Sequence, residues 1–179
     1  MVVAMLGILA ALALPKLLPV VQTSALQTAG DAVGAAATQA RMAALATRRC
    51  VRLRLPDPLT LVTEQLNSFD CENPSAPLID GSQPLWTETA RMKLEVSSMT
   101  LTLATAPTST ASEIRFRPSG RVFSADANLD DDDAVLLVTH PGLPAGQNTV
   151  RVVIDNPLAI CVLPRSRLPT GAGNTLSCP

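Results

Sequence analysis

The first 49 residues constrain the fold most, because they join an apolar run to a polar, alanine-rich run. Residues 2–14 contain no charge and no hydroxyl group. Beyond Gln22, small apolar residues recur with a helical period, at Ala25, Ala29, Ala32 or Val33, Ala36, Ala40, Ala43 or Ala44, and Ala46 or Thr47. We therefore predict one long helix over residues 1–49, apolar at its start and amphipathic over residues 22–49.

The apolar run by itself is too short to cross a bilayer. Residues 1–14 would form about 21 Å of helix, whereas the hydrocarbon core is about 30 Å thick. A helix that continues to Val21 would reach about 31 Å, with Lys16 snorkelling and two prolines accommodated. No Lys or Arg precedes the run, although both a cytoplasm-facing start and a signal peptide normally carry one. We interpret residues 1–21 as a single-pass membrane anchor whose beginning is missing.

Two glycines, Gly30 and Gly34, interrupt the alanine-rich helix. Each weakens a helix by up to about 1 kcal/mol. Their four-residue spacing indicates either a notch for close packing or tolerated flexibility.

Residues 50–179 are long enough for one domain with its own core. Cys50 to Leu55 alternates strictly, which predicts a strand with Val51, Leu53 and Leu55 inward and Arg52 and Arg54 outward. Further strands are predicted over residues 59–62, 92–96, 99–103, 114–116, 135–138, 150–154 and 158–163. Residues 66–90 are predicted to form a long loop, in which Trp86 covers the core. Short strands at this spacing favour antiparallel sheets, a sandwich or an open barrel, packed on the alanine-rich face of the helix.

The apolar run that ends in Ala-Leu-Pro at Pro15 resembles the amino-terminal helix of type IV pilins and type II secretion pseudopilins. The run Ala40–Leu45, followed by Arg48 and the strand at residues 51–53, is similar to the GspH/FimT branch of minor pilins, as is Ile114–Val122. The resemblance implies an α+β, pilin-like fold, in which a long hydrophobic helix packs on an antiparallel β-sandwich-like globular domain. Filament-core residues implied by it are Val2, Val3, Leu6, Ile8, Leu9, Leu12, Leu14 and Pro15.

This resemblance also implies a function. The chain would be a minor pilin or pseudopilin that primes or caps a type IV pilus or a type II secretion pseudopilus. Its globular domain would be periplasmic and its helix would lie in the bacterial inner membrane, with other pilins or pseudopilins as partners and no small-molecule substrate. The basic leader, Gly, Phe and Glu that begin the family have no counterpart before Val2. A start codon placed too far downstream would explain this, so we expect an in-frame upstream extension.

The chain has four cysteines, Cys50, Cys71, Cys161 and Cys178. No pair forms Cys-x-x-Cys and there is one His, which argues against a zinc site. An even number on the far side of a membrane favours disulfides. We expect the disulfides Cys50–Cys71 and Cys161–Cys178, because each closes a loop of about 20 residues or fewer. Each would stabilise the folded domain by about 3 kcal/mol. Free buried thiols are the alternative.

An acidic run occupies residues 126–133, between two predicted strands. Asp126, Asn128 and Asp130 have the spacing that opens a calcium loop, with Asp133 as a further oxygen ligand, although the glycine and the distal glutamate of such loops are absent. The run is therefore either a calcium site or a solvated hairpin tip.

A basic group surrounds the end of the helix, where Arg48, Arg49, Arg52 and Arg54 follow Arg41 without an intervening acidic residue. One interpretation is a helix end with solvent-facing strand positions. The other is an anionic partner, either an acidic neighbouring subunit or DNA. Some FimT-like minor pilins bind DNA in natural transformation through arginines near the carboxyl terminus, and the pair Arg165 and Arg167 resembles theirs.

Little in the sequence indicates an enzyme. The single histidine, His140, precedes Pro141-Gly142 in a predicted turn, and nothing marks a nucleophile elbow. The net charge of −1 predicts no bulk attraction to nucleic acid or membrane.

Overall fold

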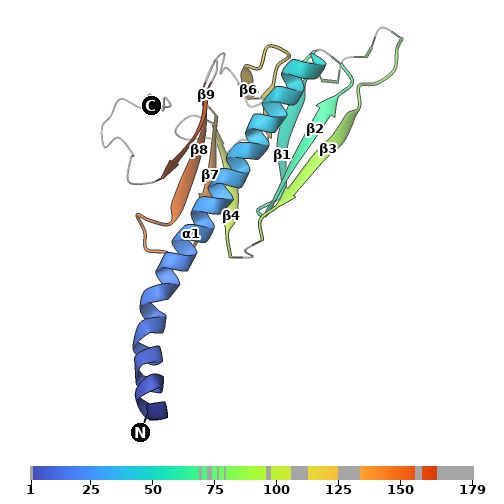
Figure 1. Cartoon of the computed structure of the whole chain (residues 1–179). Helices are drawn as coiled ribbons and strands as arrows, with labels where there is room; N and C mark the ends of the chain where they lie inside the picture. The colour runs from blue at the N-terminus through green and yellow to red at the C-terminus, as the bar shows by residue number, and fades with distance from the viewer. Residues whose placement is uncertain are drawn as a thin grey trace.

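The computed structural model describes residues 2–68, 70–71, 74–75, 77–78, 80–95, 98–105, 113–124, 134–155 and 159–164. Within the helix, side chains are described from Pro19 onward. One long helix, α1, lies against two antiparallel sheets (Figure 1). Among the described residues, no helix combines the length and the apolar character needed to cross a bilayer.

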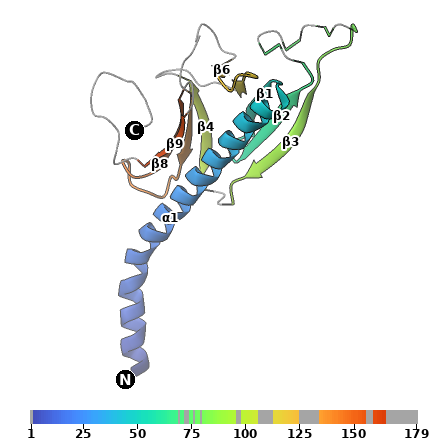
Figure 2. The same cartoon turned by 45° about the horizontal axis from the view of Figure 1, so that its top comes forward.

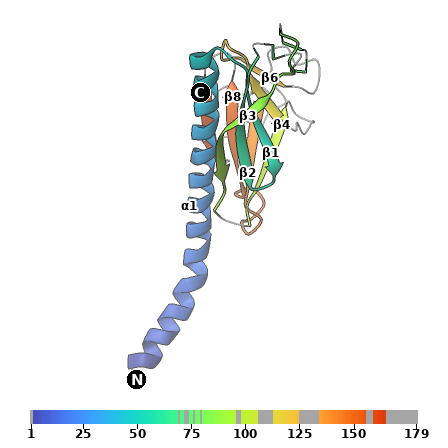
Figure 3. The same cartoon turned by 90° about the vertical axis from the view of Figure 1, so that its right-hand side faces the viewer.

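Helix α1 runs without a break over Val2–Thr47, so the apolar and the alanine-rich runs belong to one element, as predicted. Its first part projects past the sheets, and its second part lies along them (Figures 1 and 3). Arg48 follows with a φ of 52°, in the left-handed region that ends many helices. The helix therefore stops at Thr47, two residues before the predicted end at Arg49.

Both sheets lie on the same side of α1 (Figure 3), and they stand next to each other across its length (Figures 1 and 2). One has the strand order β3-β2-β1-β5-β6, with bounds β1 Val51–Asp57, β2 Thr60–Leu66, β3 Trp86–Lys93, β5 Glu113–Phe116 and β6 Val122–Ser124. The other has the order β4-β7-β8-β9, with bounds β4 Thr100–Thr105, β7 Ala134–Thr139, β8 Thr149–Asp155 and β9 Ala159–Pro164. Every described pairing is antiparallel. The predicted α+β class, with β structure packed on the helix, is confirmed.

The core lies where α1 meets both sheets. The helix contributes a seam of mostly small side chains, Leu26, Val33, Ala37, Ala40 and Ala44, each at most 2% exposed. Large side chains come from the strands, among them Leu53, Leu61, Leu101, Ile114, Phe116, Leu136 and Ile154.

The buried seam is rotated slightly from the predicted one. Ala25, Ala29, Ala36 and Ala43 pack against the core but are only partly buried, and the seam centres on Val33. Because alanines occur on several faces of this helix, their spacing alone did not distinguish the central row from its flank.

Residues 66–90 were predicted as a loop, and that prediction is wrong over residues 86–90, which belong to strand β3. The strand pairs with β2 and forms an edge of its sheet. Residues 87–91 are exposed in succession, so the sequence lacks the alternation that marks a half-buried strand. The pairing shifts register between Thr63 and Glu64, and Glu88 and Arg91 form an ion pair of 2.7 Å along the exposed strand.

Candidate functional site

Helix α1 has two parts with different surroundings. Among the described side chains, the first fully buried one is Leu26, and the two preceding valines, Val20 and Val21, are each 64% exposed. The part before them continues past the globular domain (Figure 3). The predicted filament-core residues, from Val2 to Pro15, all lie in this projecting part of the helix. The chain thus presents an apolar helical segment outside its own core.

The two helix glycines form a close contact with the sheet of β8 and β9. A Cβ at Gly30 would lie 2.5 Å from Cγ1 of Val150, and a Cβ at Gly34 would lie 2.9 Å from Cγ2 of Val162. Ordinary carbon–carbon contacts are about 3.5–4.0 Å. Of the two interpretations of these glycines, the structure favours the packing notch, which holds α1 close to the sheet.

Charged side chains form a lattice on the face of the β1 sheet that points away from α1. Arg52 Nε donates to Glu64 Oε2 at 2.5 Å, and its Nη1 donates to Glu113 Oε2 at 2.9 Å. Arg54 Nη2 donates to the other oxygen of Glu64 at 3.0 Å. Arg115 Nε donates to Glu113 Oε1 at 2.6 Å. Both carboxylates are only about 10% exposed, so the lattice is largely shielded from water.

This lattice changes the interpretation of the basic group. Arg52 and Arg54 do point away from the core, as predicted, but they are paired with carboxylates of the neighbouring strands. Arg48 and Arg49 are exposed at the end of α1. The remaining pair considered for an anionic partner, Arg165 and Arg167, lies outside the described residues.

Burial and hydrogen bonding shift the pKa of the Glu64 carboxyl group in opposite directions. Burial raises the pKa of its carboxyl group, but hydrogen bonds from Arg54 and Arg52 outweigh this, so the pKa lies below its ordinary value. The Arg52 guanidinium also stacks over the ring of Trp86, 4.1 Å from its centroid. Sequence patterns missed this lattice because the strand predicted over residues 59–62 stopped short of Glu64.

The disulfide Cys50–Cys71 is present, as predicted, with a Cα–Cα distance of 5.5 Å. Its sulfurs join a small buried cluster with Leu66, and Trp86 packs against that cluster. Trp86 therefore covers this secondary cluster and not the main core. Cys161 is disulfide-bonded, and its expected partner, Cys178, lies outside the described residues.

The buried histidine forms a structural contact. His140 is 5% exposed, and its Nδ1 accepts a hydrogen bond from the Gly142 N–H at 3.1 Å. The other ring nitrogen, Nε2, lies 3.4 Å from the Ser98 hydroxyl. The hydrogen bond from Gly142 closes the turn that follows His140.

The proposed calcium ligands, Asp126, Asn128, Asp130 and Asp133, lie outside the described residues. Within the described part of the chain, no three His, Cys, Asp or Glu side chains are grouped so that they could hold a metal ion.

Comparison with solved structures identifies the fold. The structure of the type IV minor pilin FimU of Pseudomonas aeruginosa matches with a TM-score of 0.57 at 16% sequence identity, covering 85% of this chain and 98% of that one. The minor pseudopilin EpsH of the type II secretion system of Vibrio cholerae matches with a TM-score of 0.53 at 12% identity, covering 79% of this chain and 95% of that one. No protein-family model and no curated protein sequence matches the chain. At these identities the likeness shows the minor pilin and pseudopilin fold.

Proposed function

We propose that this chain is a minor subunit of a type IV pilus or of a type II secretion pseudopilus. The observation that carries the proposal is the two-part helix α1, whose second part belongs to the core of a globular domain while its apolar first part projects from it. An apolar segment outside its own core requires either lipid or the apolar surface of another protein. A subunit that moves from the membrane into a filament is surrounded first by lipid and then by the apolar surfaces of other subunits.

Before assembly, residues 1–21 would anchor the chain in the bacterial inner membrane, with residues 50–179 in the periplasm. In the filament, residues 2–14 would bury against the corresponding helices of other subunits. The globular domain would line the outside and contact its lateral neighbours. As a minor subunit, the chain would prime or cap the filament.

The test is whether the chain enters filaments. An epitope-tagged full chain is produced in its bacterium, surface filaments are sheared off, and the tag is measured in the filament fraction. A Leu9→Arg variant places a charge in the projecting segment and should be lost from that fraction, since a charge in apolar surroundings costs several kcal/mol. Gln83→Arg adds the same charge at an exposed loop position and should be retained.

The wild-type chain found only as a free, water-soluble monomer would contradict the proposal. So would a Leu9→Arg variant that enters filaments as efficiently as the wild type.

DNA binding during natural transformation is the alternative function. The observation that favours it is the exposure of Arg48 and Arg49, whose neighbours along the chain are neutralised by carboxylates. A gel-shift with the full chain in detergent would test it. Replacing both Arg165 and Arg167 by Ala should weaken binding and flatten its salt dependence. Replacing Arg91, which is already paired with Glu88, should have little effect.

A further inference from the structure

A groove of about 700 Å³ follows α1 from Val20 to Ala32, the part of the helix that first meets the sheets. Its other wall is formed by the last residues of β3 and by Met99, which precedes β4. The volume is within the roughly 300–1,000 Å³ of sites that hold small organic ligands. The groove therefore has the size of a ligand site, and it opens where the projecting part of the helix begins.

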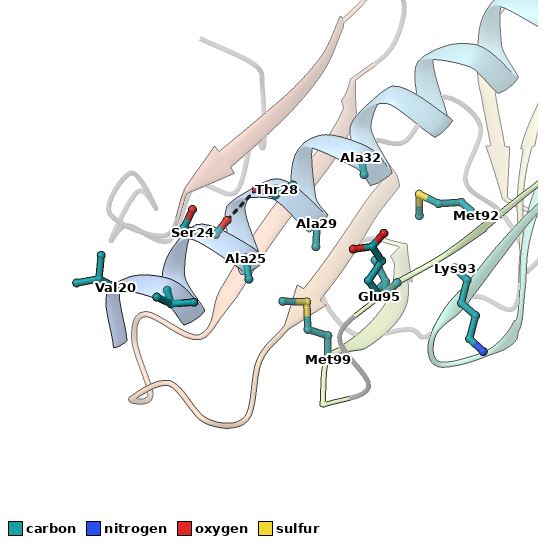
Figure 4. A pocket seen from close by; sticks show the side chains of 12 residues that line it. Val20, Ser24, Ala25, Thr28, Ala29, Ala32, Met92, Lys93, Glu95 and Met99 are labelled. Carbon is teal, nitrogen blue, oxygen red and sulfur yellow. Dashed lines mark hydrogen bonds between the residues drawn. The ribbon is translucent and has the colours of Figure 1, made fainter. Parts of the chain in front are cut away.

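The floor of the groove is apolar. In Figure 4, Ala25 and Ala29 point from α1 toward the opposite wall, where the side chains of Met92 and Met99 lie. The two alanines leave space beside the helix, and methionine side chains adapt to irregular apolar partners. This part of the groove is suited to hydrocarbon.

The margin of the groove is polar and carries two opposite charges. In Figure 4 the Glu95 carboxylate lies on the groove side of its strand, and Lys93 extends away from it. Among the described residues, the Glu95 carboxylate has no ion-pair partner. On the helix wall Ser24 and Thr28 add hydroxyl groups, of which that of Thr28 donates to the Ser24 carbonyl oxygen at 3.0 Å. A hydrocarbon floor with a charged margin matches an amphiphile.

The position of the groove indicates which amphiphile is at hand. Val20 and Val21 line its mouth and are each 64% exposed. They directly follow the part of α1 that the proposed function places in the membrane. In the anchored chain the groove would therefore open at the level of the lipid headgroups. A phospholipid can enter it from the side while its acyl chains stay in contact with the bilayer.

We propose that this groove binds one aminophospholipid, with the chemistry of phosphatidylethanolamine, while the chain is in the membrane. This inference rests on the proposed function and adds a specific lipid contact to it. The lipid ammonium group would pair with the Glu95 carboxylate and the phosphate with the Lys93 ammonium group. The upper part of an acyl chain would lie against Ala29 and Met92. An anionic lipid without an ammonium group would leave Glu95 beside a negative headgroup, so the site should select by headgroup.

Photoactivatable lipids test this site on the full chain, reconstituted in vesicles of equal parts phosphatidylethanolamine and phosphatidylglycerol. A trace of one of the two lipids carries a diazirine in its acyl chain. After irradiation, trypsin releases residues 1–16 from the projecting segment and residues 94–115 from the groove wall. We expect both probes to label residues 1–16 equally. The ethanolamine probe should label residues 94–115 several-fold more than the glycerol probe.

Two pairs of variants show whether this label comes from the groove. Thr28→Phe fills the groove from an exposed helix position and should reduce the label on residues 94–115 to background. Asp31→Phe, which is exposed on the same helix but does not line the groove, should not. Glu95→Gln should bring the ratio of the two labels close to one. Glu88→Gln, on β3 but outside the groove, should leave the ratio unchanged.

Equal labelling of residues 94–115 by the two probes would overturn the lipid site and leave the proposed function intact. Labelling of Thr28→Phe at the wild-type level would do the same. Absence of label from residues 1–16 of the wild-type chain would contradict the membrane anchor, and with it both proposals.

Discussion

The contact between Gly30 and the sheet of β8 and β9 leads to a prediction for the Gly30→Ala variant. Whether this variant is less or more stable than the wild type distinguishes a packing notch from a merely tolerated glycine. If Gly30 is a notch, Gly30→Ala should destabilise the fold, because the new methyl group would lie 2.5 Å from Cγ1 of Val150 and 3.3 Å from its Cβ. If Gly30 is only tolerated in the helix, the same change should stabilise it by up to about 1 kcal/mol, the difference in helix propensity.

The magnitude follows from the same distances. The shortest contact is about 1 Å below ordinary van der Waals separation. Val150 is 4% exposed, so its neighbours limit how far it can move away. Overpacking of this kind costs about 1–3 kcal/mol. After subtracting the gain in helix propensity, we expect a net loss of about 1 kcal/mol. Gly34→Ala, with its contact of 2.9 Å to the half-buried Val162, should be nearly neutral.

The assay is urea unfolding of the full chain in mild detergent, followed by the fluorescence of Trp86, its only tryptophan. The control is the Val150→Ala background, which removes the contacted methyl groups. In that background Gly30→Ala should no longer destabilise the fold. The coupling free energy between the two substitutions should therefore be about 1 kcal/mol or more. A Gly30→Ala variant that is more stable than the wild type would refute the notch.

Three further predictions concern the lattice, the disulfide and the acidic run. The pKa of Glu64 is lowered in the folded state, so its contribution to stability is present above the unfolded-state pKa and is lost as pH falls below about 4. Glu64→Gln should therefore lower the free energy of unfolding by about 2 kcal/mol at pH 7. It should also flatten the measured dependence of that free energy on pH. Cys71→Ser should lower the unfolding free energy by about 3 kcal/mol, measured by denaturation without reductant. If residues 126–133 bind calcium, titration calorimetry should show heat at millimolar calcium that is lost when Asp130 is replaced by Asn, and no heat in the wild type would exclude the ion.

Helical spacing and strand alternation predicted much of this fold, because both are local signals. The single helix, its packing on β structure and the Cys50–Cys71 disulfide are confirmed. These local signals failed to predict strands whose burial depends on the neighbouring strand or sheet. Residues 87–91 form an exposed edge strand, and β6 over Val122–Ser124 is short, so neither shows clear alternation.

The site was harder to predict for a related reason. Arg52 and Arg54 have the pattern of solvent-facing strand residues, and nothing nearby in the sequence shows that Glu64 and Glu113 lie beside them. Charge pairing across strands depends on register, which was not predicted. Likewise, Gly30 and Gly34 were recognised as unusual, but only the opposing valines distinguish a notch from flexibility.

The exposed edge strand β3 has a consequence for contacts with other protein chains. A strand with one unpaired side invites other chains to add to it, which leads to aggregation. Here the pairing of β3 with β2 shifts register beside Glu64, an irregularity of the kind that blunts sheet edges. An incoming strand would also have to displace the ion pair of Glu88 and Arg91. The edge at β3 is therefore protected against pairing with a strand of another chain, so contacts between subunits are left to side chains and not to shared sheets.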